Sequence, residues 1–121
     1  MDIQKTKAYY DKLTFDDVCS CESCQYFARN VKDALPEVAE YLATIGIDIE
    51  KPLETMPIED AKKGHIYYIA AQYIVIGDVE DFREKKIGDI SVEVDEFHPA
   101  AKLDEKYFVI SIGPITLEYK K

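Results

Sequence analysis

The sequence predicts an α+β fold in which N-terminal helices pack on a C-terminal antiparallel sheet. Apolar residues recur at the helical period of about 3.6 in the first half of the chain, and at the strand period of about two, or in an unbroken apolar run, in the second half. The strand segments leave no room for the long crossovers that parallel pairs need, so an antiparallel meander is expected.

The helices are expected in the first 45 residues. Loosely helical spacing near the start indicates a short amphipathic helix, carried by Ile3, Tyr9, Tyr10 and Leu13, and residues 14–17 then resemble a turn. A second helix is predicted at about 21–32, with Ser20 as its N-cap. Its core stripe lies at i, i+3, i+4 and i+7 and consists of Cys24, Phe27, Ala28 and Val31.

A third helix is predicted at about 36–45, because Pro36 suits the first turn of a helix and Gly46 suits its end. Ile47 can complete a Schellman-type cap there. The apolar stripe of this helix is Val38, Tyr41, Leu42 and Ile45. Residues 48–64 contain Pro52 and Pro57 and are expected to be irregular, with room for one helical turn at 58–63.

About four strands are predicted in the second half. Residues 65–76 are aromatic, β-branched and apolar on both faces, which is typical of a central strand covered on two sides. Further strands are expected at about 89–95 and 106–112, and after the break at Gly113 and Pro114 at about 115–119. The helices are expected to cover one face of this sheet.

Size and charge bound the partners. A chain of 121 residues has the usual length of one domain, so residues 1–121 are expected to form a single domain. The net charge of −9 repels phosphate backbones, so we expect no nucleic-acid partner and expect any charged protein partner to be basic. The sequence has no signal-like N-terminus and no apolar run of membrane-spanning length, which predicts a cytoplasmic protein without a membrane partner.

The chemically distinctive feature is a cluster of three cysteines, Cys19, Cys21 and Cys24. Three thiols within six positions do not form a disulfide framework, so reduced thiols are expected. The Cys21-x-x-Cys24 spacing suits two thiolate ligands of one zinc ion, with Cys19 as a third and His65 or His98 as a fourth. Structural zinc sites usually take a second close pair of ligands, which the sequence lacks.

Two other interpretations of the cysteines stay open. Cys24 lies on the core stripe of its predicted helix and packs there as a small hydrophobe. Cys21 falls in the first turn of the same helix, where the helix dipole favours a reactive thiolate, although Glu22 beside it disfavours one. The sequence contains no P-loop, dinucleotide fingerprint, nucleophile elbow or H-E-x-x-H motif.

Three segments resemble a small uncharacterised bacterial protein family. They are the Cys19-x-Cys21-x-x-Cys24 box with the following Gln25-Tyr26-Phe27, the Leu35-Pro36-Glu37-Val38 segment, and Ile45 to Pro52, which reads I-G-I-D-I-E-K-P. The resemblance covers about the first half of the chain. It implies a bacterial cytosolic origin and no particular activity, cofactor or site residue.

The sequence therefore favours a small acidic cytosolic binding or protein-interaction domain without catalytic activity and without a cofactor. Nine tyrosines, with Tyr67, Tyr68 and Tyr73 distributed over both faces of the central strand, are typical of a homo-oligomer or of an open binding face. The alternatives are a zinc-binding protein that uses Cys19, Cys21, Cys24 and His65, and a thiol-dependent redox enzyme.

Overall fold

The computed structural model describes residues 1–13, 22–60, 65–96, 103 and 105–118, and within these it contains three α-helices and one six-stranded antiparallel sheet. The helices are α1 (Ile3–Lys12), α2 (Glu22–Ala34) and α3 (Pro36–Thr44). The strands are β1 (Glu54–Asp60), β2 (His65–Ile76), β3 (Lys85–Ile87), β4 (Ile90–Val94), β5 (Tyr107–Gly113) and β6 (Ile115–Glu118). The predicted α+β class, with helices first and an antiparallel sheet after them, is confirmed.

Helices α2 and α3 form for the reasons that the sequence indicates. Phe27, Ala28 and Val31 are buried along one stripe of α2. The last turn of α3 ends in a Schellman motif, in which the Ile47 N–H donates to the Leu42 carbonyl at 2.9 Å and the Gly46 N–H to the Ala43 carbonyl at 3.1 Å. The predicted helix end at Gly46 is therefore confirmed.

Gly46 also allows α3 to pack against α1. Its φ of +88° lies in the left-handed region, and a Cβ there would stand 2.6 Å from the Ile3 carbonyl oxygen and 2.8 Å from the Lys7 nitrogen. A side chain at this position is excluded on both counts. The chain then runs through residues 47–53 to β1 and is fixed to the sheet by Tyr73, whose hydroxyl donates to the Ile49 carbonyl at 2.6 Å.

The sheet order is β1-β2-β5-β4-β3, with β6 also paired to β2, so the predicted simple meander is wrong. Strands β3, β4 and β5 lie side by side in sequence order, but β5 returns to pair with β2 and separates β2 from β3. Residues 77–84, which include the 3-10 turn Val79–Asp81, carry the chain from the centre of the sheet to its edge. β2 is the longest described strand and lies inside the sheet, with β1 on one side and β5 and β6 on the other.

β5 and β6 form one interrupted strand along β2. β5 pairs with Ala71 to Ile76, and β6 pairs with His65 to Tyr68. The register of β1 shifts opposite the same part of β2, between Thr55 and Pro57. The core-facing positions of β2 accordingly change phase there, from Ile66 and Tyr68 to Ala71, Tyr73 and Val75.

Gly113 makes the interruption possible. A Cβ at this position would overlap the Ile69 carbonyl oxygen and would stand 3.1 Å from the Cα of Ala70. The two backbones therefore touch at the point where β2 changes phase, and only glycine allows that approach.

β1 was not predicted, and the expected helical turn at 58–63 is wrong where the structure describes it, because residues 58–60 belong to this strand. Pro57 suggested an irregular segment, since proline has no N–H to donate to a ladder. β1 is an edge strand with a register shift next to Pro57, and these are the two situations in which a strand tolerates proline.

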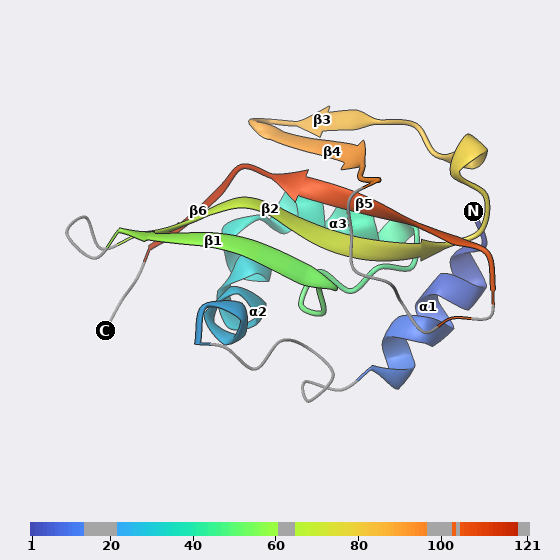
Figure 1. The fold of residues 1–121 in the computed structure, drawn as a ribbon, viewed down its shortest axis with the longest axis horizontal. Coiled ribbons are helices and arrows are strands. Elements are labelled where there is room, and N and C mark those ends of the chain that lie inside the picture. The colour runs from blue at the N-terminus through green and yellow to red at the C-terminus, as the bar shows by residue number, and fades with distance from the viewer. Residues whose placement is uncertain (14–21, 61–64, 97–102, 104, 119–121) are drawn as a thin grey trace.

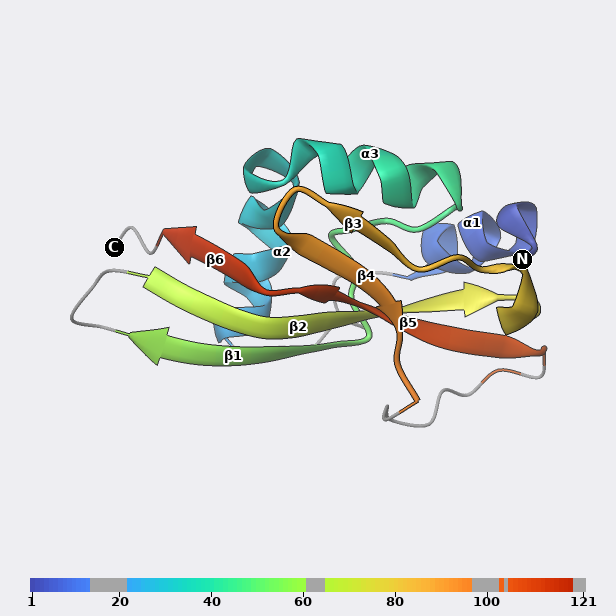
Figure 2. The same cartoon turned by 90° about the horizontal axis from the view of Figure 1, so that it is seen from above.

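α2 and α3 pack on one side of the sheet, and α1 lies at the edge of β2, with Tyr10 in the main core and Tyr9 also against the cluster on the other face. In Figure 1, β1, β2 and β5 pass in front of α2 and α3, and Figure 2 shows α1 and α3 on the same side of these strands. The main core lies between the two layers and includes Phe27, Leu42, Tyr68, Tyr73 and Ile110. Of the described helices, only α1 reaches the opposite face, through Tyr9.

α1 closes the edge of β2 beyond the end of β1. The Tyr10 hydroxyl donates to the Ile74 carbonyl at 2.8 Å, and the Asp2 N–H donates to the Ile76 carbonyl at 2.8 Å. The Thr6 hydroxyl accepts from the Ile76 N–H at 3.1 Å. These contacts from α1 and its N-cap satisfy backbone groups that a neighbouring strand would otherwise bind.

Candidate functional site

The predicted metal and thiol residues lie mostly outside the described part of the chain. Cys19, Cys21 and His98 are outside it altogether. The backbone places Cys24 in the first turn of α2 and His65 at the start of β2, opposite Asp60 and Glu118. Among the residues that the structure describes, no three histidine, cysteine or acidic side chains gather as a metal site would require. The zinc and thiol interpretations stay predictions.

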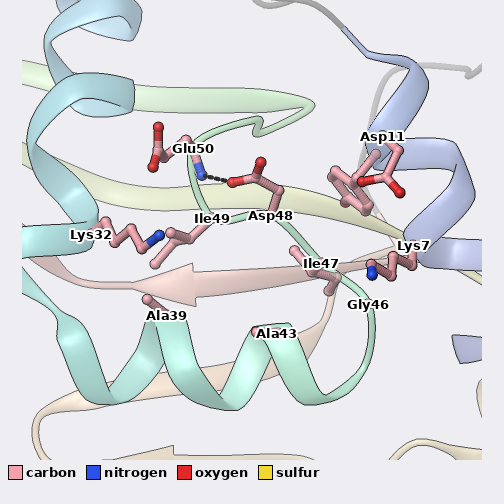
Figure 3. Close-up of a pocket in the computed structure, with 11 residues that line it drawn as sticks. Lys7, Asp11, Lys32, Ala39, Ala43, Gly46, Ile47, Asp48, Ile49 and Glu50 are labelled. Atoms are coloured by element: carbon pink, nitrogen blue, oxygen red, sulfur yellow. Dashed lines mark hydrogen bonds between the residues drawn. The ribbon is translucent and has the colours of Figure 1, made fainter.

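A hollow of about 250 Å³ lies between α1, α3 and the segment that follows α3 (Figure 3). Lys7 and Lys32 point into it from opposite sides, across the apolar surface of Ile47 and Ile49. The acidic side chains Asp11, Asp48 and Glu50 line the remainder. The two signs of charge are mixed around this hollow, so it does not concentrate the field that would select an anion or a cation.

Asp48 in this wall has a structural role. Its carboxylate accepts a hydrogen bond from the Glu50 N–H at 3.0 Å and stands 3.9 Å from the Lys51 ammonium. Lys51 in turn donates to the Tyr10 carbonyl at 2.7 Å, which ties the segment after α3 to α1. These contacts hold two elements together.

Two buried tyrosines stand behind the same hollow. Burial raises the pKa of Tyr10 well above its usual value, and the neighbouring Tyr9 raises it further. Burial likewise raises the pKa of Tyr73, with smaller contributions from Tyr10 and Asp48. Both hydroxyls donate to backbone carbonyls and are neutral near pH 7, so they are unsuited to act as bases.

The open face of the sheet carries an exposed apolar patch on β1 and β2. The side chains are Met56, Ile58, Tyr67 and Ile69, with exposed fractions of 37%, 51%, 38% and 52%. Ile58 pairs directly with Tyr67, and Met56 lies beside the part of β2 that holds Ile69. These four residues, hereafter the apolar patch, are most of the large apolar side chains that the described chain exposes; the others are Ile3 and Val79.

An acidic row lies next to the apolar patch on the same face. Residues that pair directly project from the same side of a sheet, and the pairs Glu54 with Gln72, Gln72 with Ser111, and Ser111 with Glu93 define one row across four strands. Glu54 and Glu93 are exposed, and the side chains between them are neutral. We call Glu54 and Glu93 the acidic row.

Beyond the acidic row the same face is covered. Ile74, Ile76 and Val109 form a second buried cluster, against which Tyr9, Leu53, Leu103 and Tyr107 pack. The Gln72 amide donates to the Asp95 carboxylate at 2.8 Å at the border of this cluster. The open face is therefore divided along β2 into an exposed half and a covered half.

A search of family models, of curated proteins and of solved structures finds no match to this chain. Within the described residues, no helix is long and apolar enough to cross a membrane.

The sequence suggests an open binding face that includes Tyr67, but it does not indicate Met56, Ile58 or Ile69. The predicted cover on both faces of β2 holds for residues 71–76 and fails at Tyr67 and Ile69. Met56 and Ile58 were expected in an irregular segment. A strand over residues 54–58 would have indicated them, because alternate positions of a strand share one face. Such a strand places Met56 and Ile58 on the same face as Glu54, and Thr55 and Pro57 on the other.

Proposed function

We propose that this protein is a small acidic interaction domain of the cytoplasm, which binds a basic protein partner through the apolar patch and has no catalytic activity of its own. The observation that supports the proposal is the concentration of exposed apolar side chains on the half of the open sheet face that no described helix covers. Exposed apolar groups that gather on one surface mark binding sites more often than groups that are scattered singly.

Covering the exposed part of each side chain of the apolar patch contributes on the order of 1 kcal/mol. Between 37% and 52% of each residue's surface is exposed in the free protein, and this exposed part adds nothing to stability until something covers it. Their gathering is therefore better explained by a partner than by folding.

The acidic charge of the protein indicates the charge of its partner. The net charge of −9 and the exposed acidic row favour a basic partner, whose association slows as salt screens the attraction. Tyr67 contributes an amphipathic ring of the kind that is enriched at protein interfaces.

The test is capture of a partner from a lysate of the natural source cells by the immobilised protein, followed by reconstitution from purified components. We expect a stoichiometric complex by titration calorimetry that weakens between about 50 and 300 mM salt. Ile69→Ser should reduce its affinity by about ten-fold or more, since it removes about 1.4 kcal/mol of binding free energy.

Ile3→Ser is the matched control, because Ile3 is exposed to a similar extent, 48%, and lies outside the apolar patch. It should leave the affinity unchanged. If Ile69→Ser and Ile3→Ser lower the affinity equally, or if neither changes it, the patch is not the binding surface.

A further inference from the structure

We infer that the apolar patch binds a basic amphipathic helix, with the apolar stripe of the helix on Met56, Ile58, Tyr67 and Ile69 and its lysine or arginine side chains directed to Glu54 and Glu93. This assignment rests on the proposed function and names the form and charge of the partner segment.

The dimensions of the apolar patch suit a helix laid across the face. Adjacent strands are about 4.8 Å apart, and alternate residues of a strand are about 7 Å apart, so the four side chains occupy a compact area. An amphipathic helix presents apolar residues at i, i+3, i+4 and i+7, which spans about 10 Å in two turns. One short apolar stripe therefore covers the apolar patch.

Addition of an extended strand is less suited to this site. A strand would add at the outer edge of β1, beyond which the described part of the chain has no further strand, and there Pro57 lacks the N–H that a ladder uses. α2 also packs against β1 and β6. The exposed apolar groups stand on the face of the sheet, at right angles to the direction in which an added strand would bind.

The acidic row defines the charge of the helix. Glu54 is two residues from Met56 on the same face of β1, and Glu93 lies on β4, about 14 Å across three strand spacings. Lysine or arginine side chains on the flanks of a helix about 10 Å wide reach both carboxylates. Lys86 shares the face but stands on β3, beyond β4 from the apolar patch.

A second copy of the chain is a poorer occupant. Two copies packed face to face would bring together two acidic rows and two molecules of net charge −9. Like charges placed opposite one another oppose the contact. The same charge disfavours an anionic lipid surface.

The experiment uses a fluorescently labelled 18-residue peptide of leucine and lysine, with leucine at i, i+3, i+4 and i+7 spacing, and a twin in which glutamate replaces lysine. Fluorescence anisotropy measures the affinity of each peptide for the full chain. We expect the lysine peptide to bind at least about ten-fold more tightly than the glutamate peptide, a difference of about 1.4 kcal/mol. Ile69→Ser should lower the affinity for the lysine peptide about ten-fold, and Ile3→Ser should leave it unchanged.

The double variant Glu54→Gln with Glu93→Gln tests the charge. It should lower the affinity for the lysine peptide by about two- to five-fold at low salt, which is the size of effect expected from losing exposed ion pairs. The affinity should then depend less on salt concentration. Circular dichroism of each variant verifies that it folds, and the peptide should gain helical signal on binding.

The outcomes separate the two proposals. Equal binding of both peptides, or no binding of either, overturns the helix assignment. If the captured partner still depends on Ile69 in that case, the proposed function stands and only the form of the partner is wrong. A self-associated dimer that Ile69→Ser dissociates in sedimentation velocity would replace the basic helix by a second copy.

Discussion

The two halves of β2 differ in their exposure to solvent. Residues 71–76 are buried on both faces, and α1 closes the edge of residues 74–76 beyond the end of β1. Residues 66–69 alternate between the core, at Ile66 and Tyr68, and the open face, at Tyr67 and Ile69. The amino-acid composition hardly changes between the halves, so the difference lies in what packs on them.

This difference assigns distinct roles to similar side chains. Ile69 and Ile74 are on the same strand and the same face, yet Ile69 is 52% exposed and Ile74 is 1% exposed. The covered half belongs to a buried cluster, and the exposed half is the surface to which we assign the partner under the proposed function.

Ile74→Ala and Ile69→Ala should differ most in their effect on the free energy of unfolding. Ile74→Ala leaves a cavity in the second buried cluster and should lower the free energy of unfolding by about 2–4 kcal/mol. Ile69→Ala removes a side chain that is 52% exposed and should lower the free energy of unfolding by no more than about 1 kcal/mol. Urea unfolding followed by circular dichroism measures both, and similar losses would contradict the division of β2.

Gly113→Ala tests the junction between the halves. The new methyl group would overlap the Ile69 carbonyl oxygen, so the backbones must move apart. We expect a loss of about 1–3 kcal/mol in urea unfolding. Gly88→Ala is an informative comparison because no atom lies within 4 Å of its added Cβ, and only its positive φ opposes the change. Gly88→Ala as costly as Gly113→Ala would argue against close packing at the junction.

Thr6→Val tests the closure of the edge by α1. Valine keeps the shape of threonine but cannot accept the hydrogen bond from the Ile76 N–H. A buried N–H without a partner costs about 1–3 kcal/mol, so stability should fall by that amount. Hydrogen exchange should become faster at the Ile76 amide and stay unchanged in β4, and an unaltered rate at Ile76 would contradict this role.

Raised pH should unfold the protein through its buried tyrosines. The folded pKa of Tyr10 and of Tyr73 is raised, so their contribution is fully present below the unfolded pKa of about 10 and is lost as pH rises above it. Tyrosinate absorbance near 295 nm should therefore show a second step that coincides with loss of circular dichroism. Titration of all nine tyrosines before unfolding would contradict the burial of these two.

The smallest effect is expected at Asp78. The Glu80 N–H and then the Lys106 ammonium lower the pKa of this exposed carboxyl, so its contribution is present above the unfolded pKa and is lost as pH falls through the folded pKa. Asp78→Asn should remove a slight acid dependence of stability below about pH 4. Stability curves of the two proteins that differ equally at pH 3 and pH 7 would contradict this assignment.

The helices and most strands could be predicted from the sequence because their signals are local. The stripe at Phe27, Ala28 and Val31 and the Gly46 cap depend only on residues within one helix. The strand order depends on which segments meet across long distances in sequence, and alternation does not encode that choice. β1 was missed because Pro57 opposes a strand locally and its place at the edge of the sheet tolerates it.

The candidate site was harder to predict than the fold. The sequence directs attention to the cysteines, whose chemistry is visible in any context. It contains no equivalent sign that Ile69 is exposed while Ile74 is buried, because both belong to one apolar run. Their exposure depends on α1 and on the residues that cover Ile74, which include Leu53 and Leu103.

The closure of the β2 edge by α1 also bears on aggregation. Residues 73–76 form a continuous apolar segment, Tyr-Ile-Val-Ile, of the kind that stacks into intermolecular β-structure once its edge is bare. α1 packs on that edge through few groups, chiefly Asp2, Thr6 and Tyr10. Loss of these contacts would leave backbone groups of Ile74 and Ile76 unpaired at that edge, so we expect variants that detach α1 to aggregate more readily than the parent protein.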